Sequence, residues 1–193
     1  MIVALTGTPG TGKSTVSQYL RKDGYEVIDI NEIVISKNFI LGYDEARETS
    51  EVDLKALNKY LQKQLASNLK GKAKSSHPSK AIKTMILEGH IAHLLTVVDR
   101  VIVLRCHPIE LQNRLRAKGW LVAKVRENLE AEAVDAITIE SINIHGQDKI
   151  FEIDTSKATP EKVSDSVKKI INGKINNYTP GKIDWSEEIL KWY

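Results

Sequence analysis

The chain has 193 residues, of which 41% are hydrophobic and 27% charged, so it is long enough for a single domain, residues 1–193, with a sizeable hydrophobic core. Its 28 Lys and Arg residues against 25 Asp and Glu residues give a net charge of +3, which by itself does not indicate a nucleic-acid-binding protein. The single cysteine, Cys106, excludes an intramolecular disulfide, and no apolar run reaches the roughly 18 residues that a membrane-spanning helix needs. We therefore expect a soluble cytoplasmic protein that makes no contact with a membrane.

The chain opens with a predicted strand and a phosphate-binding loop. Ile2–Thr6 is a short apolar run, and Gly7–Ser14 reads GTPGTGKS, which matches the G-x-x-x-x-G-K-[ST] pattern. Val16, Tyr19 and Leu20 then recur at helical spacing. A strand, the loop and a helix in this order are the context in which the pattern binds a nucleotide, whereas the alternative is a glycine-rich turn that binds nothing.

The residue types in the loop predict how it would hold ATP. Gly7, Gly10 and Gly12 allow positive φ angles, so that successive backbone N–H groups can point at a polyphosphate. The ammonium group of Lys13 is expected at the β- and γ-phosphates, and the hydroxyl of Ser14 at a Mg²⁺ ion. The ATP-binding residues predicted here are Gly10, Thr11, Gly12, Lys13, Ser14 and Thr15, the last beside the α-phosphate.

Strands and helices alternate along the rest of the chain. Short apolar runs predict further strands at Glu26–Asp29, Thr84–Leu87, Val101–Arg105 and Ile150–Ile153. Helical spacing of apolar residues predicts helices over about 52–69, 108–117 and 121–144. This alternation is typical of an α/β fold with a five-stranded parallel sheet and helices on both faces.

Three segments interrupt this alternation and carry candidate binding residues. Residues 31–51 mix acidic residues with Arg47 after the second strand, where open α/β sheets bind ligands, so they are a candidate second-substrate pocket. Residues 70–80, KGKAKSSHPSK, predict an exposed loop, with RNA contact as the alternative. Between two predicted helices, Gly119 is a candidate hinge among cations that would close over phosphates. These cations are Arg114, Arg116, Lys118, Lys124 and Arg126.

The third predicted strand is followed by Glu88 and His90. Phosphate-loop enzymes place an acidic residue that holds the Mg²⁺ shell at the carboxyl end of a buried strand, so Glu88 is the second candidate metal ligand. His90 would then lie near the transferred phosphate or an attacking water. The alternative is a helix-start acid followed by a structural histidine, as we expect for His93. Because the sequence has no Cys and His cluster with zinc-ligand spacing, the only metal expected arrives with the nucleotide.

Five stretches of the chain carry a resemblance to a known family. They are TGTPGTGKST near the N-terminus, VIDINEIV after the second strand, ILEGH at the third, RLRAKGW and KVRENLEAE. In order and spacing, from about Ile2 to Val163, the chain resembles the adenylate kinase isoenzyme 6 family, with the archaeal branch the closer likeness. The phosphate loop is common to many proteins, whereas the stretches Arg114–Trp120 and Glu88–His90 are the specific part of the resemblance.

The resemblance implies a P-loop NTPase three-layer sandwich and a small nucleoside monophosphate kinase. Such a kinase moves the γ-phosphoryl group of ATP to AMP with the help of Mg²⁺, and it also hydrolyses ATP. The family's link to maturation of the small ribosomal subunit implies a ribosomal protein and rRNA as further partners. Residues 31–53 match the monophosphate-binding segment, residues 114–126 match a short lid, and residues 174–193 form a C-terminal extension.

The residue patterns and the resemblance together assign roles to individual residues. The expected catalytic residues are Lys13, Glu88, His90 and Arg114. The lid residues expected to contact ATP are Arg114, Lys118 and Lys124. The residues expected to bind the acceptor are Asn31, Glu32 and Arg47.

The chain also departs from the better-known adenylate kinases. It lacks an Asp-Gly-Phe-Pro-Arg run after the third strand, its lid is too short for a separate domain, and it has Glu88 where eukaryotic members of the resembled family carry Asp. Three interpretations therefore stay open: an adenylate kinase, a ribosome assembly factor switched by nucleotide, and a kinase for a metabolite alcohol. The acidic Asp44, Glu45, Glu48 and Glu51 would suit the alcohol or a basic acceptor, although they are equally consistent with a solvated face. Near the C-terminus, Trp185, Ile189 and Trp192 share a helical face that either packs on the core or docks a partner.

Overall fold

The structure is a computed structural model that describes residues 1–44, 49–72 and 84–190. Arg47, residues 73–80 of the lysine-rich stretch and Trp192 lie outside the described residues. Of the helices in the described part, none is both long and apolar enough to cross a membrane.

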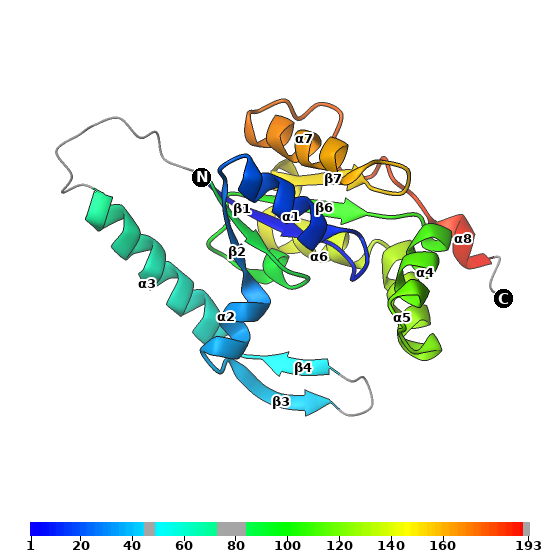
Figure 1. The fold of residues 1–193 in the computed structure, drawn as a ribbon, viewed down its shortest axis with the longest axis horizontal. Coiled ribbons are helices and arrows are strands. Elements are labelled where there is room, and N and C mark those ends of the chain that lie inside the picture. Colours follow the sequence, from blue (N-terminus) through cyan, green and yellow to red (C-terminus); the bar gives the residue numbers. More distant parts are fainter. Residues whose placement is uncertain (45–48, 73–83, 191–193) are drawn as a thin grey trace.

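The centre of the molecule is a five-stranded parallel sheet (Figure 1). Its strands are β1 (Ile2–Thr6), β2 (Glu26–Asp29), β5 (Met85–Glu88), β6 (Arg100–Arg105) and β7 (Ile150–Asp154), in the spatial order β2-β5-β1-β6-β7. The central strand β1 has Ala4 in register with Leu87 on one side and with Val101 on the other. The predicted α/β fold with five parallel strands is confirmed. Strand β5 lies one residue later than the sequence predicted, so Glu88 is the last residue of the strand instead of following it.

Helices cover both faces of the sheet (Figure 1). The helices of the described residues are α1 (Lys13–Lys22), α2 (Ile30–Ser36), α3 (Leu54–Lys72), η1 (Ala92–Leu94), α4 (Pro108–Ala117), α5 (Val122–Ala133), α6 (Ala136–His145), η2 (Gln147–Lys149), α7 (Pro160–Ile171) and α8 (Ser186–Leu190). Of these, α4, α5 and α8 lie beyond the ends of the strands, where α4 and α5 pack on each other. Because successive side chains of a strand point to opposite faces, Val3 and Leu5 pack with α1 and α7, whereas Ala4 packs with α2 and α3. The expected layer of helices on each face is therefore present.

The path of the chain changes side at β1. From β1 the chain enters α1, which packs on one face of the sheet, but from β5 to β6 it passes through residues 89–99, which pack on the other face. The strand order reverses at this point, with β5 and β2 on one side of β1 and β6 and β7 on the other. In open parallel sheets, ligands bind at the carboxyl ends of the strands beside such a reversal.

The long helix predicted over 121–144 is wrong, because the structure has two helices there. Helix α5 ends at Ala133, and Asp135 adopts a left-handed backbone with φ of 56° before α6 begins. The apolar spacing continues through this break, so local sequence gave no sign of it. The carboxylate of Asp135 is bound by the guanidinium of Arg105 at the end of β6, a contact that fixes the unusual conformation from outside the helix. A small core of Cys106, Leu111, Leu115, Val125 and Leu129 joins α4 to α5, so Cys106 is buried.

Residues 31–53 contain a hairpin that the sequence analysis missed. After α2 come the antiparallel strands β3 (Ile40–Asp44) and β4 (Thr49–Val52), and in Figure 1 they extend away from the central sheet. Most residues of β3 are exposed, so the strand lacks the alternation of buried and exposed side chains from which a strand can be predicted. The segment is therefore a small two-stranded unit attached to the sheet through α2 and α3.

The C-terminal extension returns to the body of the molecule. Helix α8 begins after Asp184, whose carboxylate accepts a hydrogen bond from the backbone N–H of Ser186 at 2.8 Å. The ring of Trp185 packs edge-on against the imidazole of His107 at the start of α4, with 4.7 Å between the ring centres. Of the predicted aromatic face, this described residue packs on the body of the protein.

Candidate functional site

The phosphate loop has the backbone that its glycines predict. Gly7, Gly10 and Gly12 have φ angles of 138°, 95° and 100°, and Gly12 caps the amino end of α1. A Cβ atom added at Gly7 would lie 2.3 Å from the carbonyl oxygen of Leu104, and one added at Gly10 would lie 2.8 Å from the side chain of Leu111. The loop is thus pressed between the end of β6 and helix α4, where glycine alone fits.

Lys13 is a buried cation at the centre of the loop. Its Nζ atom donates hydrogen bonds to the carbonyl oxygens of Gly7, at 2.7 Å, and of Thr8, at 3.1 Å. Burial lowers the pKa of the Lys13 ammonium from 10.5 to about 8, although the negative charges of Glu88 and Glu132 oppose this shift. A phosphate at the loop would supply the negatively charged partner that the buried Lys13 ammonium lacks, since its present acceptors are neutral carbonyl oxygens.

Acidic and hydroxyl oxygens face the start of α1. The Ser14 hydroxyl lies 3.4 Å from a carboxylate oxygen of Glu88, and Ser14 itself is exposed, as is Thr15. Glu88 is in register with Asp29 on the neighbouring strand β2. Burial raises the pKa of the Glu88 carboxyl, the charge of Asp29 raises it further, and Lys13 opposes both effects. Oxygen donors with excess negative charge are suited to Mg²⁺, so Ser14 and Glu88 fit the predicted metal site.

Asp29 is a candidate functional residue that the sequence analysis did not single out. Its carboxylate caps α2 by accepting hydrogen bonds from the backbone N–H groups of Asn31, at 2.8 Å, and Glu32, at 3.4 Å. This places two of the three predicted acceptor-binding residues, Asn31 and Glu32, in the first turn of α2, exposed and next to the end of β2. Within the described residues there is no group of three or more His, Cys, Asp or Glu side chains that could hold a metal ion. The position of Asp29 at the end of a predicted strand was a signal that could have found it.

His90 is exposed and follows β5. Desolvation by its surroundings lowers the pKa of the His90 imidazole, and the nearby positive charges of Lys13 and Lys124 lower it further. His90 is therefore within electrostatic reach of both the loop and the lid. By contrast His93 is buried, with Nδ1 3.2 Å from the Thr6 hydroxyl and Nε2 3.0 Å from a carboxylate oxygen of Glu140, which agrees with the structural role expected for it.

The structure divides the predicted lid residues between two places. The guanidinium of Arg114 donates to the carbonyl oxygen of Thr155 at 2.9 Å, in the loop after β7. Lys118, exposed at the end of α4, is close enough to lower the pKa of Lys13. Lys124 forms an ion pair of 3.0 Å with Glu127 and lines a cavity of about 310 Å³ together with Gly119, Trp120 and Leu121. Lys118 thus lies within electrostatic reach of Lys13 and Lys124 within reach of His90, whereas Arg114 is bonded beside the end of β7.

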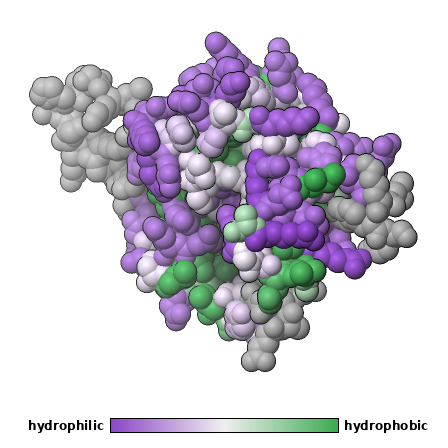
Figure 2. Space-filling view, turned by 45° about the vertical axis from the view of Figure 1, so that its right-hand side comes forward, coloured by the Kyte–Doolittle hydropathy of each residue, from purple (hydrophilic) through white to green (hydrophobic). Residues whose placement is uncertain are grey.

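Exposed apolar side chains occur on the two segments that flank the loop. In the hairpin segment, Leu41 is 64% exposed and Tyr43 is 61% exposed. In the lid, residues 114–126, Leu121 is 63% exposed and Val122 is 76% exposed. Figure 2 shows a mostly hydrophilic face with hydrophobic side chains gathered toward its lower part. Both segments therefore present apolar surface, which is available for closing on a ligand or a partner.

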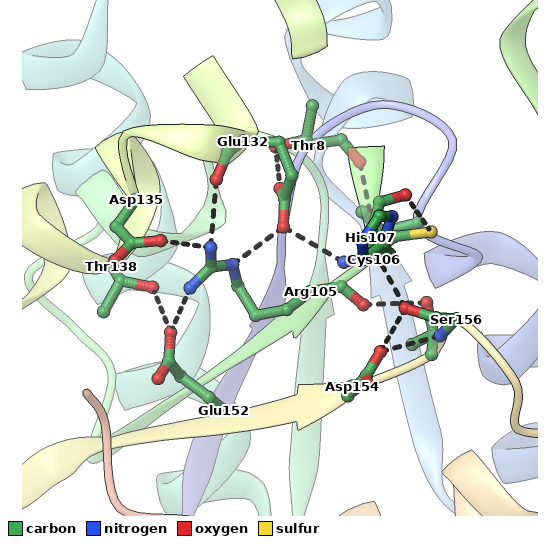
Figure 3. Close-up of polar contacts among 12 residues, drawn as sticks. Thr8, Arg105, Cys106, His107, Glu132, Asp135, Thr138, Glu152, Asp154 and Ser156 are labelled. Atoms are coloured by element: carbon green, nitrogen blue, oxygen red, sulfur yellow. Dashed lines mark hydrogen bonds and ion pairs between the residues drawn. The ribbon is translucent and has the colours of Figure 1, made fainter. Parts of the chain in front are cut away.

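A buried network of charged residues lies behind the loop, and the sequence analysis missed it (Figure 3). Arg105 donates to Glu132 at 2.8 Å, to Glu152 at 2.5 Å, and to Asp135. The Thr8 hydroxyl of the phosphate loop donates to the other oxygen of Glu132 at 2.5 Å. The available signal was a charged residue directly after or between buried apolar residues in each of two strands, Arg105 in β6 and Glu152 in β7, since such residues are buried only with a partner.

The strand order, the phosphate loop at the end of β1 and the helices on both faces define a P-loop kinase fold. A family model described as an AAA domain matches residues 3–135. A protein of Methanothermobacter thermautotrophicus named "Putative adenylate kinase" is 38% identical to this chain over 98% of it and 99% of its own length. A protein of the same name from Methanosarcina acetivorans is 36% identical, over 98% of this chain and 100% of its own. The chain belongs to the family of these archaeal proteins.

A solved structure shares the architecture at much lower sequence identity. Shikimate kinase from Acinetobacter baumannii, in complex with shikimate, superimposes with a TM-score of 0.56 at 16% identity, over 90% of this chain and 93% of that chain. At this identity the similarity bears on the fold alone.

Proposed function

We propose that this protein is an adenylate kinase that transfers the γ-phosphoryl group of ATP to AMP and hydrolyses ATP when AMP is absent. The observation that carries the proposal is the buried Lys13 ammonium in a phosphate loop whose Ser14 hydroxyl faces the Glu88 carboxylate. The name of the archaeal relatives supports the same substrate pair. Cations of the lid that affect the pKa of Lys13 and His90 support a site that gathers positive charge around a polyphosphate.

Phosphoryl transfer requires the protein to align the donor and acceptor phosphates and to neutralise their negative charge. Bound beside Ser14 and Glu88, Mg²⁺ would supply positive charge to the β- and γ-phosphate oxygens. The backbone N–H groups of the loop and the dipole of α1 hold the phosphates of ATP. Lys13 exchanges its two carbonyl acceptors for phosphate oxygens, and Lys118 and Lys124 approach from the lid as it closes. Arg114 is held at the loop after β7 through the carbonyl oxygens of Thr155 and Ser156.

The acceptor would bind between the loop and the hairpin segment. Asn31 and Glu32 lie in the first turn of α2 beside the carboxyl end of β2, next to Glu88 in the neighbouring strand. Arg47 of the same predicted site lies outside the described residues. When the acceptor site is empty, water held near His90 takes the place of the AMP phosphate, and the lowered pKa of the imidazole keeps it neutral and able to accept a proton.

A second candidate function is that of an assembly factor for the small ribosomal subunit, with a ribosomal protein and rRNA as partners and nucleotide as the switch. The exposed Leu41 and Tyr43 of the hairpin favour it, because apolar side chains on a small protruding unit are suited to a protein contact. In this case ATP hydrolysis would be the main reaction of the site.

One pair of assays separates these functions. ADP formed from ATP plus AMP is compared with phosphate released from ATP alone, and Lys13→Met is expected to abolish both. His90→Ala is expected to reduce phosphate release by about a hundredfold or more while leaving ADP formation from AMP largely in place, since general acid–base groups contribute roughly 10²–10⁴-fold. Negligible ADP formation that depends on AMP would refute the kinase and leave the switch. Activity on shikimate-like alcohols in place of AMP would instead identify a metabolite kinase.

A further inference from the structure

The phosphate loop is tied to the lid helix α5 through one hydrogen bond. The hydroxyl of Thr8, the second residue of the loop, donates to Oε2 of Glu132, in the last turn of α5, at 2.5 Å. Each of these residues is only 2% exposed, so solvent water is not at hand to replace either partner. In Figure 3 the Thr8 and Glu132 side chains point toward each other across the start of the loop.

The second oxygen of Glu132 is held from the sheet. Oε1 accepts hydrogen bonds from Nε of Arg105, at 2.8 Å, and from the backbone N–H of Cys106, at 3.0 Å. The guanidinium of Arg105 also donates to the backbone carbonyl of Glu132 at 2.9 Å. The carboxylate is therefore fixed in one orientation, and the end of α5 is attached to the end of β6.

Within the loop, Thr8 takes part in several hydrogen bonds. Its carbonyl oxygen accepts from Lys13 Nζ at 3.1 Å and from the Thr11 hydroxyl at 2.9 Å. The position of Thr8 thus sets the position of the ammonium group that is to meet the γ-phosphate. When that ammonium turns to a phosphate, the bond from Thr8 to Glu132 remains as a side-chain link between the loop and α5.

We propose that Glu132 is a positioning residue that holds the phosphate loop in its binding conformation through Thr8 and transmits occupancy of the loop to α5. This rests on the proposed function, because it requires ATP at the loop. Lys124 lies eight residues before Glu132 on the same helix, roughly 12 Å away along the helix axis. A small tilt of α5 about its fixed end moves Lys124 toward or away from the phosphates, so the lid cation responds to the loop.

The test uses two substitutions at Thr8 and a matched control. Thr8→Val removes the hydroxyl with little change of shape, and Thr8→Ser keeps a hydroxyl. Thr138→Val removes a hydroxyl of the same kind from the same buried network, where it donates to Glu152 at 2.8 Å, but does not touch the loop. Calorimetry with Mg-ATP gives the affinity of each folded variant, thermal unfolding gives its stability, and hydrogen exchange with and without Mg-ATP follows residues 122–133.

Thr8→Val is expected to bind Mg-ATP roughly tenfold more weakly than the parent, as expected for loss of a hydrogen bond to a charged group. It is also expected to lose the ATP-induced change of exchange in α5. Thr8→Ser is expected to restore both to within about twofold. Thr138→Val is expected to unfold at a lower temperature with parental affinity and parental exchange in α5.

Two results would overturn the inference. In the first, Thr8→Val binds Mg-ATP with the affinity of the parent and shows the same ATP-induced change of hydrogen exchange in α5. In the second, Thr138→Val loses affinity as much as Thr8→Val, which would show that the network acts through stability alone. If the parent itself fails to bind Mg-ATP, the proposed function fails instead, so the two failures are distinguishable.

Discussion

At the scale of single residues, the buried Lys13 ammonium is expected to make nucleotide binding sensitive to pH. In the protein without nucleotide, burial lowers the pKa of the Lys13 ammonium to about 8. A bound polyphosphate favours the charged ammonium and therefore raises this pKa. Binding above pH 8 therefore takes up a proton, and the affinity for Mg-ATP is expected to fall as pH rises through 8, by up to about tenfold per pH unit. Calorimetry at several pH values, in buffers of different ionisation enthalpy, measures both the affinity and the proton uptake.

The control for this prediction is Lys13→Arg. A guanidinium stays protonated throughout this pH range, so the variant should bind more weakly at pH 7 but show no proton uptake between pH 8 and 9. Parental proton uptake in Lys13→Arg would mean that another group titrates.

At the scale of elements, the ends of α1 and α2 are built alike but from different residues. Each helix is followed by one residue with a left-handed backbone: Gly24, with φ of 84°, and Asn38, with φ of 54°. In each case the next N–H bonds back across the turn, Tyr25 to the Leu20 carbonyl and Phe39 to the Val34 carbonyl. The left-handed conformation is thus adopted by a glycine, which has no Cβ, after α1, and by an asparagine, which has one, after α2.

We therefore expect opposite effects of substitution at these two positions. Gly24→Ala should lower the free energy of unfolding by about 1–2 kcal/mol, because nothing contacts the added Cβ within 4 Å and the effect is purely conformational. Asn38→Gly should raise it by roughly 0.5 kcal/mol, since glycine adopts this backbone more readily. Urea unfolding of both variants measures the two values. A destabilised Asn38→Gly would show that the asparagine side chain contributes more than its backbone preference.

The elements that the sequence predicted are those specified by local pattern. Strand β1, the phosphate loop and the capped end of α1 follow from an apolar run and from glycines that permit positive φ, so they could be predicted residue by residue. The break at Asp135 could not, because an ion pair with Arg105, thirty residues away, decides it. The hairpin was missed because its exposed strands carry no periodic burial.

The residues of the candidate site also differ in whether a local sequence pattern predicts them. The loop residues are adjacent in sequence and recognisable as a pattern, whereas Glu132 reaches Thr8 from 124 positions away. In the sequence, the stretch Glu127–Ala133 has the composition of a solvated helix face, and folding alone reveals that one of its acids is buried. Pairwise contacts of this kind need the three-dimensional structure.

At the scale of the whole molecule, stability depends on the charged network inside the fold. Arg105 is 1% exposed and joins β6 to α5, β7 and the α5–α6 turn through three carboxylates. Arg105→Met would leave the buried Glu132 and Glu152 without their cation, so the free energy of unfolding is expected to fall by about 3–5 kcal/mol. Urea unfolding measures this loss.

A surface arginine provides the comparison. Arg126→Met removes an exposed pair with Glu130 on the same helix α5 and should change the free energy of unfolding by less than about 1 kcal/mol. If the two substitutions cost the same, the buried network is no more important to stability than a surface pair.

The reversal of strand order at β1 has a consequence for how such proteins diversify. The strand order that creates this reversal is a property of the backbone path, so the ligand position beside it depends little on the identity of the surrounding side chains. The inserts that border it, from α2 to β4 and from α4 to α5, are attached outside the sheet, so a lineage can lengthen or exchange them without disturbing the framework. Dependence on a nucleoside triphosphate should therefore be inherited far longer than preference for any one acceptor.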